Sequence, residues 1–488
     1  MSTLFSRRAL MAGGTALAAC GTLPRFALSA EPFKLAITRR TLVVNGKAAS
    51  VFGIQQPDGT AGLTLDPGQR FRVDLANEAG EDAVIHWHGM TPPYLQDGVA
   101  DQDRPLIAVG KTASYDFAPR TGTHWMHSHH GLQEQRLMAA PLIVHSADDL
   151  KADMQEVVVL LHDFTFKDPA ELLAGLGASA MSHAGHDMSN MGNMDMSNMD
   201  MGNMDMSGMD MGAMSGGAMA MDLNDVDYDA YLANDRTLAD PLVIRTERKG
   251  RVRLRLINGA TSTAFHIDLG SLTGSVIAVD GNAVQPVSAR RFPMAMGQRL
   301  DILVDLPESG GAFPILAVRE GGRERTGVIL ATPGATVAKV AEQGTTPADA
   351  VTVDFETRLA AVTPLAAKPV ARTLRATLTG GMSPYVWSIN GETFGQHHPF
   401  EVGLGERVVI DMVNDSMMAH PMHLHGHHFQ VVGINGRSFS GAMRDTVLVP
   451  IGGKVSIAFD ADNAGRWPFH CHNLLHMATG MMTEVVYA

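Results

Sequence analysis

Cysteine is scarce in this chain of 488 residues, which contains only Cys20 and Cys471. Two cysteines so far apart argue against a framework of structural disulfides. Basic residues are also in deficit, with 38 Lys and Arg against 51 Asp and Glu and a net charge of -13. This balance argues against nucleic acid or an anionic membrane surface as a partner. The hydrophobic content of 45% is ordinary for a soluble globular protein, and the length suffices for about three domains at ~150 residues each.

Residues 1–30 have the features of an export signal. Ser6-Arg7-Arg8-Ala9-Leu10 resembles a twin-arginine signal, and the apolar run that follows is shorter than the ~20 residues of a membrane span. We predict export to the periplasm by the twin-arginine machinery, with cleavage near Ala30. Leu17-Ala18-Ala19-Cys20 also matches a lipoprotein cleavage box, which would leave a lipid anchor on Cys20. A basic N-terminus without a signal function is the remaining alternative.

The C-terminal stretch His470-Cys471-His472 combines two metal-ligand types. Successive side chains of a strand point to opposite faces, so Cys471 projects to one side and both histidines project to the other. Cysteine, two histidines and a weakly held methionine form the ligand set of a blue-copper electron-transfer site, and Cys471, His476 and Met481 supply three of these four. A lone cysteine is more often a small buried hydrophobic residue, but the flanking histidines favour a copper site with a second metal centre beside it.

A pattern of glycine, alternating apolar residues, asparagine and histidine occurs three times. It runs from Gly68 to Asn77 and from Gly405 to Asn414, and in both copies a His-x-His pair begins nine residues after the asparagine. The middle copy, from Gly250, is one residue shorter in each interval. The alternation indicates half-buried strands, and three copies predict three β domains of one architecture. We place the domains at residues 31–147, 148–335 and 371–488, with a linker at 336–370.

A second repeated element joins the first and third domains. Gly122–His129 parallels Gly465–His472, with Ser128 at the position of Cys471. The first domain therefore keeps paired histidines and lacks the thiolate. The middle domain has an aspartate in place of the second histidine after His266, and we predict that His266 is structural.

A methionine-rich segment lies within the middle domain at residues 181–221. It holds 14 of the 31 methionines and is dense in Gly, Ser and Asn, which predicts an insertion without packed structure. Thioethers are soft ligands that favour Cu(I). We interpret the segment as a device that captures copper, the alternative being a neutral linker.

Four His-x-His pairs complete the pattern, two in the first domain and two in the third. The spacing places both imidazoles of a pair on one strand face. Eight imidazoles are enough for a cluster of three coppers where the two domains meet, and His420 is left to join Cys471 and His476 at the blue site, with Met481 in the axial position. The pairs are His86 and His88, His127 and His129, His423 and His425, and His470 and His472.

These motifs resemble the four signatures of the multicopper oxidases, and the similarity spans nearly the whole chain after the leader. The methionine-rich insertion and residues 227–236 resemble the periplasmic copper-resistance branch. The resemblance implies an all-β fold of three cupredoxin-like Greek-key β-sandwiches that hold four copper ions. It assigns type 1 copper to His420, Cys471, His476 and Met481, and type 2 copper to His86 and His423. It assigns the type 3 pair to His88, His127, His129, His425, His470 and His472.

The implied reaction takes electrons one at a time at the blue copper and passes them through Cys471 to the cluster, where dioxygen is reduced to water. Asp97 matches a family carboxylate near the cluster, and we expect it to relay protons. Asp445 is a weaker candidate, and either residue could instead be a carboxylate of a solvated turn. Some relatives carry a further carboxylate at the position of Met477, so the proton path here is expected to differ.

The expected reductant is Cu(I), which would serve copper tolerance. Met418, with Asp415 nearby, is placed to present Cu(I) to the blue site, although Met417 and Met418 also suit core packing. The runner-up is a laccase-like oxidase of phenols or aromatic amines. A copper-binding protein without turnover is disfavoured because storage needs no trinuclear cluster.

Overall fold

The computed structural model describes residues 31–101, 103–184 and 223–488, without the side chains of 178–184. The chain divides into the units Met1–Pro32 and Phe33–Ala488, and the second contains all the elements below. The predicted leader with Cys20, and residues 185–221 of the predicted insertion, lie outside the described residues. In the described ranges, no helix is both long and apolar enough to cross a membrane.

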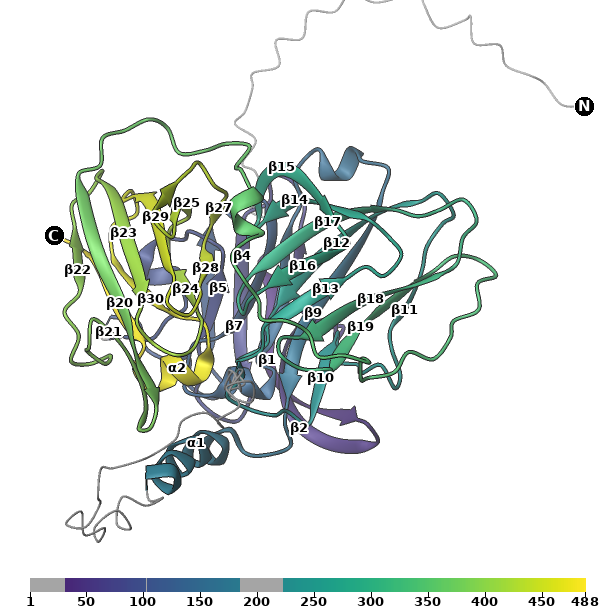
Figure 1. Ribbon diagram of the computed structural model, residues 1–488, viewed down its shortest axis with the longest axis horizontal. Helices are drawn as coiled ribbons and strands as arrows, with labels where there is room; N and C mark the ends of the chain where they lie inside the picture. Colours follow the sequence, from purple (N-terminus) through teal and green to yellow (C-terminus); the bar gives the residue numbers. More distant parts are fainter. Residues whose placement is uncertain (1–30, 102, 185–222) are drawn as a thin grey trace, which may run out of the picture. The chain divides into compact units, whose positions relative to one another are not determined.

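The second unit consists of six β-sheets, two for each third of the chain (Figure 1). This arrangement confirms the predicted all-β fold with three β-sandwiches. In each third, the first strand pairs in parallel with a central strand: β1 with β4, β9 with β12, and β20 with β23. The central strand then pairs antiparallel with a third strand: β4 with β6, β12 with β17, and β23 with β29. The same topology three times accounts for the repeat in the sequence.

The first domain packs a sheet of order β2-β1-β4-β6 against one of order β3-β8-β7-β5. In β4, Phe71, Val73 and Leu75 are buried and alternate with half-buried polar residues, as the pattern predicts. The strands are β1 Phe33–Val44, β2 Lys47–Gln55, β3 Leu63–Leu65, β4 Phe71–Glu78, β5 Ile85–His88, β6 Thr112–Phe117, β7 Gly122–Ser128 and β8 Ala139–Val144, with 3-10 turns η1 Tyr94–Gln96, η2 Gln133–Arg136 and η3 Asp149–Lys151.

The second domain has sheets of order β10-β9-β12-β17-β14-β15 and β11-β19-β18-β13-β16. Its elements are β9 Gln155–Phe164, α1 Pro169–Ala184, β10 Ala230–Ala233, β11 Val243–Arg245, β12 Arg251–Asn258, β13 Phe265–Asp268, β14 Gly274–Val279, β15 Asn282–Ala289, β16 Arg291–Met294, β17 Arg299–Asp305, β18 Ala312–Arg319 and β19 Arg325–Ala331, followed by η5 Glu356–Arg358. Helix α1 extends to Ala184, so residues 181–184 of the predicted insertion are helical.

The third domain has sheets of order β21-β20-β23-β29-β25-β26 and β22-β31-β30-β24-β28, and β27 also pairs with β25. Its elements are β20 Arg372–Met382, β21 Tyr385–Ile389, β22 Phe400–Val402, β23 Arg407–Asn414, β24 His420–Leu424, β25 Phe429–Ile434, β26 Arg437–Ser438, β27 Met443–Arg444, β28 Thr446–Val449, β29 Lys454–Asp460, β30 Arg466–Cys471, α2 Leu474–Ala478 and β31 Met482–Tyr487.

The asparagine of each repeat lies at or next to the end of the equivalent strand: Asn77 in β4, Asn258 in β12 and Asn414 in β23. Each is buried and accepts a hydrogen bond from the backbone N–H two residues later, at 3.0, 3.1 and 2.9 Å. Each amide group also donates to backbone carbonyls of the loops around it. This Asx turn fixes the path of the chain out of the strand, which explains why the asparagine recurs.

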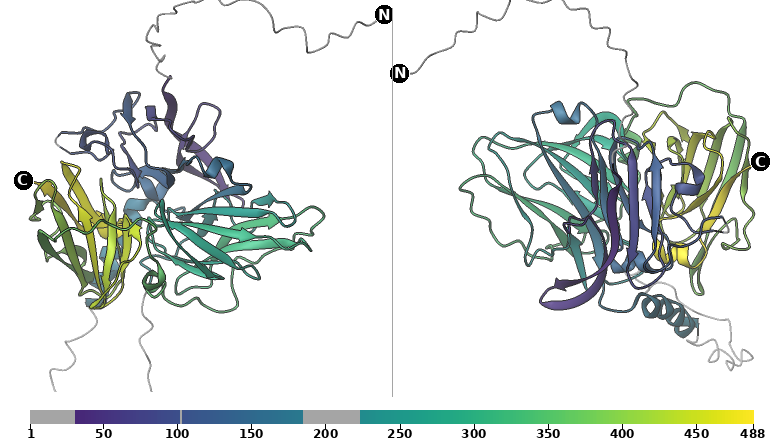
Figure 2. Two further views of the ribbon diagram at one scale, coloured as in Figure 1. Left: turned by 90° about the horizontal axis from the view of Figure 1, so that it is seen from above. Right: turned by 180° about the vertical axis from the view of Figure 1, so that it is seen from behind.

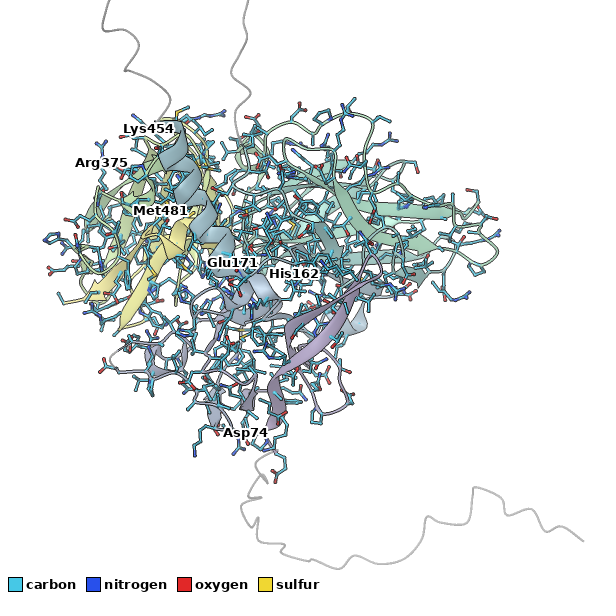
Figure 3. The ribbon with its side chains drawn as sticks, turned by 90° about the horizontal axis from the view of Figure 1, so that it is seen from below. Asp74, His162, Glu171, Arg375, Lys454 and Met481 are labelled. Carbon is cyan, nitrogen blue, oxygen red and sulfur yellow. The ribbon has the colours of Figure 1, made fainter. Side chains whose placement is uncertain are left out.

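The three domains lie side by side, each beside the other two (Figure 2). The hairpin of β1 and β2 reaches the second domain, where Arg40 pairs with Asp235 at 2.8 and 2.9 Å. Helix α1 contacts β20 and β21 of the third domain and crosses that domain on the side that carries Met481 (Figure 3). The chain therefore enters the methionine-rich segment beside the third domain.

A buried ionic cluster lies where strand β12 of the second domain meets the first domain. Arg255 is 0% exposed and donates to Glu156 at 3.0 Å, to Thr123 at 3.0 Å and to Asp301 at 3.2 Å. Because buried charges are stable only when they are paired and hydrogen-bonded, this arginine fixes how the two domains meet.

We expect Arg255→Met to lower the free energy of unfolding by about 1–3 kcal/mol, since Glu156 and Thr123 lose a hydrogen-bond donor while Asp301 keeps Arg253 at 2.6 Å. Urea unfolding measures the change. The matched control is Arg251→Met on the same strand, because Arg251 makes an exposed ion pair with Asp305 at 2.7 Å and such pairs contribute about 0–1 kcal/mol. An equal loss of unfolding free energy in the two variants would contradict the inference that Arg255 holds the first and second domains together.

Candidate metal centres

The His-x-His pairs lie on adjacent strands in the same register in two domains. In the first domain β5 pairs with β7, so that His86 lies opposite His127. In the third domain β24 pairs with β30, so that His423 lies opposite His470. Ser128 is opposite Ile85 and Cys471 is opposite Met422, so Ser128 and Cys471 occupy equivalent positions, as the repeat suggests.

Cys471 faces two imidazoles on one side of β30. Its Sγ lies 3.6 Å from His420 Nδ1 and 3.7 Å from His476 Nδ1, and the two nitrogens are 3.0 Å apart. All three residues are 0% exposed. Met481 is also buried, and its backbone carbonyl accepts from the N–H of Cys471 at 3.1 Å. A thiol and two imidazoles at these separations suit a three-ligand copper site.

His470 and His472 lie on the other side of this stretch and join histidines of the first domain. His472 Nε2 is 3.2 Å from His88 Nδ1, and these two group with His127. His470 Nε2 is 3.0 Å from His425 Nε2 and 3.4 Å from His129 Nε2. The structure thus forms two triads of imidazoles, each with members from both domains.

His86 and His423 complete the group of eight. Their ligand atoms lie within 4.8 Å of one another and of His88. The ring of His86 is 3.8 Å from that of His425, and the ring of His423 stacks on His88 at 3.9 Å. All eight imidazoles of the four His-x-His pairs therefore converge where the first and third domains meet.

The outer nitrogens of most of these imidazoles are held by hydrogen bonds, which orients the inner nitrogens. Backbone carbonyls of Asp97, Ser128, Asp445 and Cys471 accept from His86, His127, His423 and His470, at 2.8–3.1 Å. The inner Nε2 atoms of His86, His127 and His423 are buried and have no hydrogen-bond partner. Buried nitrogens without partners are costly unless a cation occupies the shared space, so this donor set fits bound metal.

Burial keeps the ligand groups neutral. Desolvation lowers the pKa of His88, His127, His423 and His425 well below the usual value, and the pKa of His470 to about 3. Desolvation also raises the pKa of the Cys471 thiol. Neutral imidazole is the form that binds a metal, and a bound cation displaces the thiol proton. The centre therefore suits metal cations and disfavours imidazolium.

Asp97 is fully buried and lies beside two histidines of the cluster. Its Oδ2 is 2.9 Å from His425 Nδ1, its Oδ1 is 3.4 Å from His86 Nδ1, and the guanidinium of Arg104 is 3.8 Å from Oδ2. Oδ1 has no hydrogen-bond partner. One carboxylate thus bridges imidazoles from two domains.

Asp445 lies at the opposite edge and pairs with a cation. It contacts His88 Nε2 at 3.1 Å and the buried guanidinium of Arg299 at 2.5 and 2.7 Å. Burial alone would raise the pKa of Asp445, but Arg299 and His88 hold it well below its usual value. Asp445 is therefore a fixed negative charge that orients His88.

Two further carboxylates hold ligand histidines and were not found from the sequence. Glu134 Oε2 is 2.8 Å from His127 Nδ1, and Asp225 Oδ1 is 3.3 Å from His476 Nε2. The polar run around Glu134, close after the His-x-His pair of β7, is a signal that sequence reasoning could have used. Asp225 comes from the second domain, just after the methionine-rich segment, and no motif marks it.

The second domain supports the cluster, although none of its histidines among the described residues joins a ligand group. Gly297 has a φ of +76°, and a Cβ there would lie 2.7–3.2 Å from the ring of His472. A side chain at this position would displace that imidazole. His266 lies apart from the cluster and contacts the carbonyl of Asp349 at 3.0 Å, and it joins none of the ligand groups of the described residues.

The candidate substrate residues precede His420 on one loop. Met418 is buried at 6% exposure, whereas Met417 is 71% exposed and Asp415 is exposed. In this conformation the thioether of Met417, and not that of Met418, faces outward. Met477, directly after His476, is half-buried.

Comparison with known proteins agrees with these centres. Three family models, each described as multicopper oxidase, match residues 36–149, 156–338 and 368–488. A curated relative, multicopper oxidase MmcO of Mycobacterium tuberculosis, is 30% identical over 99% of this chain and 97% of its own length. Copper resistance protein A of Escherichia coli is 26% identical over 98% of both chains.

Solved structures share the fold. Fet3p, a multicopper oxidase that functions in iron import, aligns with a TM-score of 0.74 and 17% identity over 94% of this chain and 90% of its own. The laccase of Botrytis aclada aligns with a TM-score of 0.73 and 21% identity over 93% and 87%. The three matched family models and the relative at 30% identity show that this chain belongs to the multicopper oxidases, a family of copper-dependent oxidoreductases that use dioxygen.

Proposed function

We propose that this protein oxidises Cu(I) at a type 1 copper and reduces dioxygen to water at a trinuclear cluster, and that this activity serves copper tolerance. The observation that carries the proposal is that one stretch, residues 470–472, joins the thiol–imidazole triad to both imidazole triads. An electron-accepting site and an oxygen-reducing site are thereby held a few bonds apart.

Four copper ions fit the ligand groups. Type 1 copper would be held by Cys471, His420, His476 and Met481, type 2 copper by His86 and His423, and the type 3 pair by the two imidazole triads. When bound, copper supplies the one-electron chemistry that single side chains lack.

The chain provides a direct path between the two centres. The Nδ1–H of His470 donates to the carbonyl of Cys471 at 2.9 Å, so the thiol-bearing residue is connected to a cluster imidazole both by the backbone and by a hydrogen bond. Burial of the whole path excludes water and holds the donor and acceptor groups in one geometry.

Asp97 is the residue we propose for proton delivery. It contacts two cluster imidazoles and retains one oxygen atom without a partner. Asp445 is tied to Arg299, which suits an electrostatic role better than proton exchange. Because Met477 provides no carboxylate, more of the proton delivery falls to Asp97.

Cu(I) is the favoured reductant on three grounds. First, both ends of the methionine-rich segment adjoin the third domain. Helix α1, which leads into the segment, contacts β20 and β21, and Asp225, which follows the segment, contacts His476. Second, Met417 and Asp415 are exposed just before His420, where they could receive Cu(I). Third, similarity to copper resistance proteins agrees with this substrate.

A laccase-like activity on small phenols or aromatic amines is the second candidate, supported by relatives named laccase, such as laccase-2 of Podospora anserina at 24% identity. His476 is 0% exposed, which opposes direct contact with a bulky phenol. We further propose export to the periplasm by the twin-arginine route, with cleavage near Ala30 or lipidation at Cys20.

The first test is Cys471→Ser. We expect it to abolish the intense visible absorption of a copper thiolate and to lower the copper content from about four to about three ions per chain, because the thiolate is the defining ligand of such a site. Visible absorption and metal analysis measure both. Ser128→Ala, at the equivalent strand position, is the control and should keep the colour. A blue Cys471→Ser protein would refute the assignment.

The second test is Asp97→Ala. Loss of a positioned proton donor costs about 10²–10⁴-fold in rate, so steady-state oxygen consumption should fall while the visible absorption stays unchanged. Asp103→Ala, an exposed carboxylate of the same loop, should have no effect on turnover. Unchanged oxygen consumption in Asp97→Ala would remove this residue from proton delivery.

The third test compares Cu(I) with a dimethoxyphenol as reductant in parallel oxygen-consumption assays. Deleting residues 181–221 should slow Cu(I) oxidation and leave phenol oxidation unchanged or faster, because thioethers are the ligands that favour Cu(I). A variant with all 14 methionines of this range replaced by glutamine keeps the length and should match the deletion. Full Cu(I) activity in both variants, with a preference for the phenol, would favour the laccase-like alternative.

A further inference from the structure

All four tryptophans of the chain are 0% exposed, and they are Trp87, Trp125, Trp387 and Trp467. Trp125 stacks on His127 with ring centroids 4.2 Å apart, and Trp387 lies 4.2 Å from His476. Each of these indoles therefore packs directly against a histidine of a candidate centre. Tryptophan is among the side chains that are most easily oxidised by one electron, so its position beside an oxidising centre has chemical consequences.

Two of the tryptophans lead to a tyrosine whose hydroxyl donates to an aspartate. The rings of Trp467 and Tyr94 are 5.8 Å apart at 80°, and Tyr94 donates to Asp101 Oδ2 at 2.6 Å. At the blue site the rings of Trp387 and Tyr385 are 5.9 Å apart at 85°, and Tyr385 donates to an aspartate at 2.7 Å.

The domain repeat does not account for this recurrence. Tyr94 belongs to the first domain and Tyr385 to the third, while the aspartate that accepts from Tyr385 is Asp225 of the second domain. The same three residue types thus meet in the same geometry from different parts of the chain. The arrangement of Tyr94 belongs to the cluster side, whereas that of Tyr385 belongs to the thiol–imidazole triad, because Trp387 packs on His476.

Trp467 connects to the cluster side. It lies on β30 three residues before His470, and its ring is 5.7 Å from that of His427. The Nδ1–H of His427 donates to the carbonyl of the cluster residue His425 at 3.0 Å. A Cβ on the intervening Gly426 would lie 2.3 Å from the indole, so the backbone between the cluster histidine and Trp467 is in close contact with the ring.

Tyr94 forms the outer end of this path. It is half-buried, and the side chain of Asp101 is 21% exposed. Arg104 donates to Asp101 at 2.6 Å, and its guanidinium lies 4.1 Å over the ring of Tyr94. Burial alone would raise the pKa of Asp101, but the hydrogen bonds from Arg104 and Tyr94 hold it below its usual value. Asp101 is therefore an ionised acceptor for the phenolic proton.

We propose that Trp467, Tyr94 and Asp101 form a discharge route that carries oxidising equivalents from the oxygen-reducing site to the protein surface. The proposal rests on the proposed function, which supplies the oxidant: dioxygen that has received fewer than four electrons because the reductant is scarce. Without such a route, this oxidant would react with the buried imidazoles and with Cys471.

The step balances as one electron and one proton. Tyr94 loses an electron, which passes through Trp467 to the oxygen-reducing site, and its phenolic O–H bond breaks as the proton binds to Asp101. The neutral tyrosyl radical then takes an electron from a reductant at the surface, either Cu(I) or a small phenol. Asp101 returns the proton to Tyr94.

The test uses the copper-loaded protein, which is mixed with dioxygen and with fewer than four equivalents of Cu(I) per dioxygen. The mixture is then frozen and examined by electron paramagnetic resonance. We expect an organic radical whose signal narrows when the tyrosines are ring-deuterated. Tyr94→Phe keeps the packing on Trp467 and removes only the hydroxyl, and it should abolish this signal. Under scarce reductant, Tyr94→Phe should also lose its own activity several-fold faster than the native protein.

Tyr115→Phe is the matched control. The rings of Tyr115 and Trp87 are 4.9 Å apart at 80°, but among the described residues no carboxylate accepts a hydrogen bond from the Tyr115 hydroxyl. This variant should keep both the radical and the native lifetime. The same tyrosyl signal in Tyr94→Phe, or oxygen consumption without any radical in the native protein, would overturn the route alone. Copper-loaded protein that consumes no oxygen would overturn the proposed function and the route together.

Discussion

The structure depends on placing ten imidazoles and one thiol in an interior from which water is excluded. Such groups are tolerated only when they are neutral and when each polar atom has a partner. Most of the outer nitrogens meet these conditions through carbonyls, a hydroxyl and the carboxylates of Asp97, Glu134, Asp225 and Asp445. The inner nitrogens do not, and metal is the partner they fit. The need to give each buried polar atom a partner explains why residues of all three domains contact this interior.

Most of the ligand set was predictable from spacing alone. In an extended strand, His-x-His fixes which side chains share a face, and the repeat aligns β5 and β7 with β24 and β30. Sequence reasoning therefore grouped the histidines that the structure brings together. Asp97 was selected through the family resemblance, because its position nine residues after His88 matches that of a family carboxylate. The prediction of three β-sandwiches rested on the same repeat, which follows one strand topology in all three domains.

The supporting residues were less predictable because they act across domain boundaries. Arg299 and Gly297 of the second domain touch Asp445 and His472 of the third, and neither residue belongs to a motif. Asp225 reaches His476 from a position 251 residues away. Local periodicity contains no information about such contacts. Likewise, the choice between Met417 and Met418 depends on which side of a loop faces outward, and two adjacent identical residues give no basis for that choice.

The cluster joins the two ends of the described chain. His86 lies near the beginning and His472 near the end, 386 residues apart by their numbers, yet each belongs to a set of ligand atoms that also includes His88. A nascent chain cannot assemble this site until the strand that ends at Cys471 has been synthesised and folded, so metal uptake would follow the synthesis of that strand. Copper bound to these residues would act as a non-covalent crosslink between the first and third domains and would add its binding free energy to their stability. Metal loading would thus distinguish chains that contain residues 470–476 from chains truncated before them.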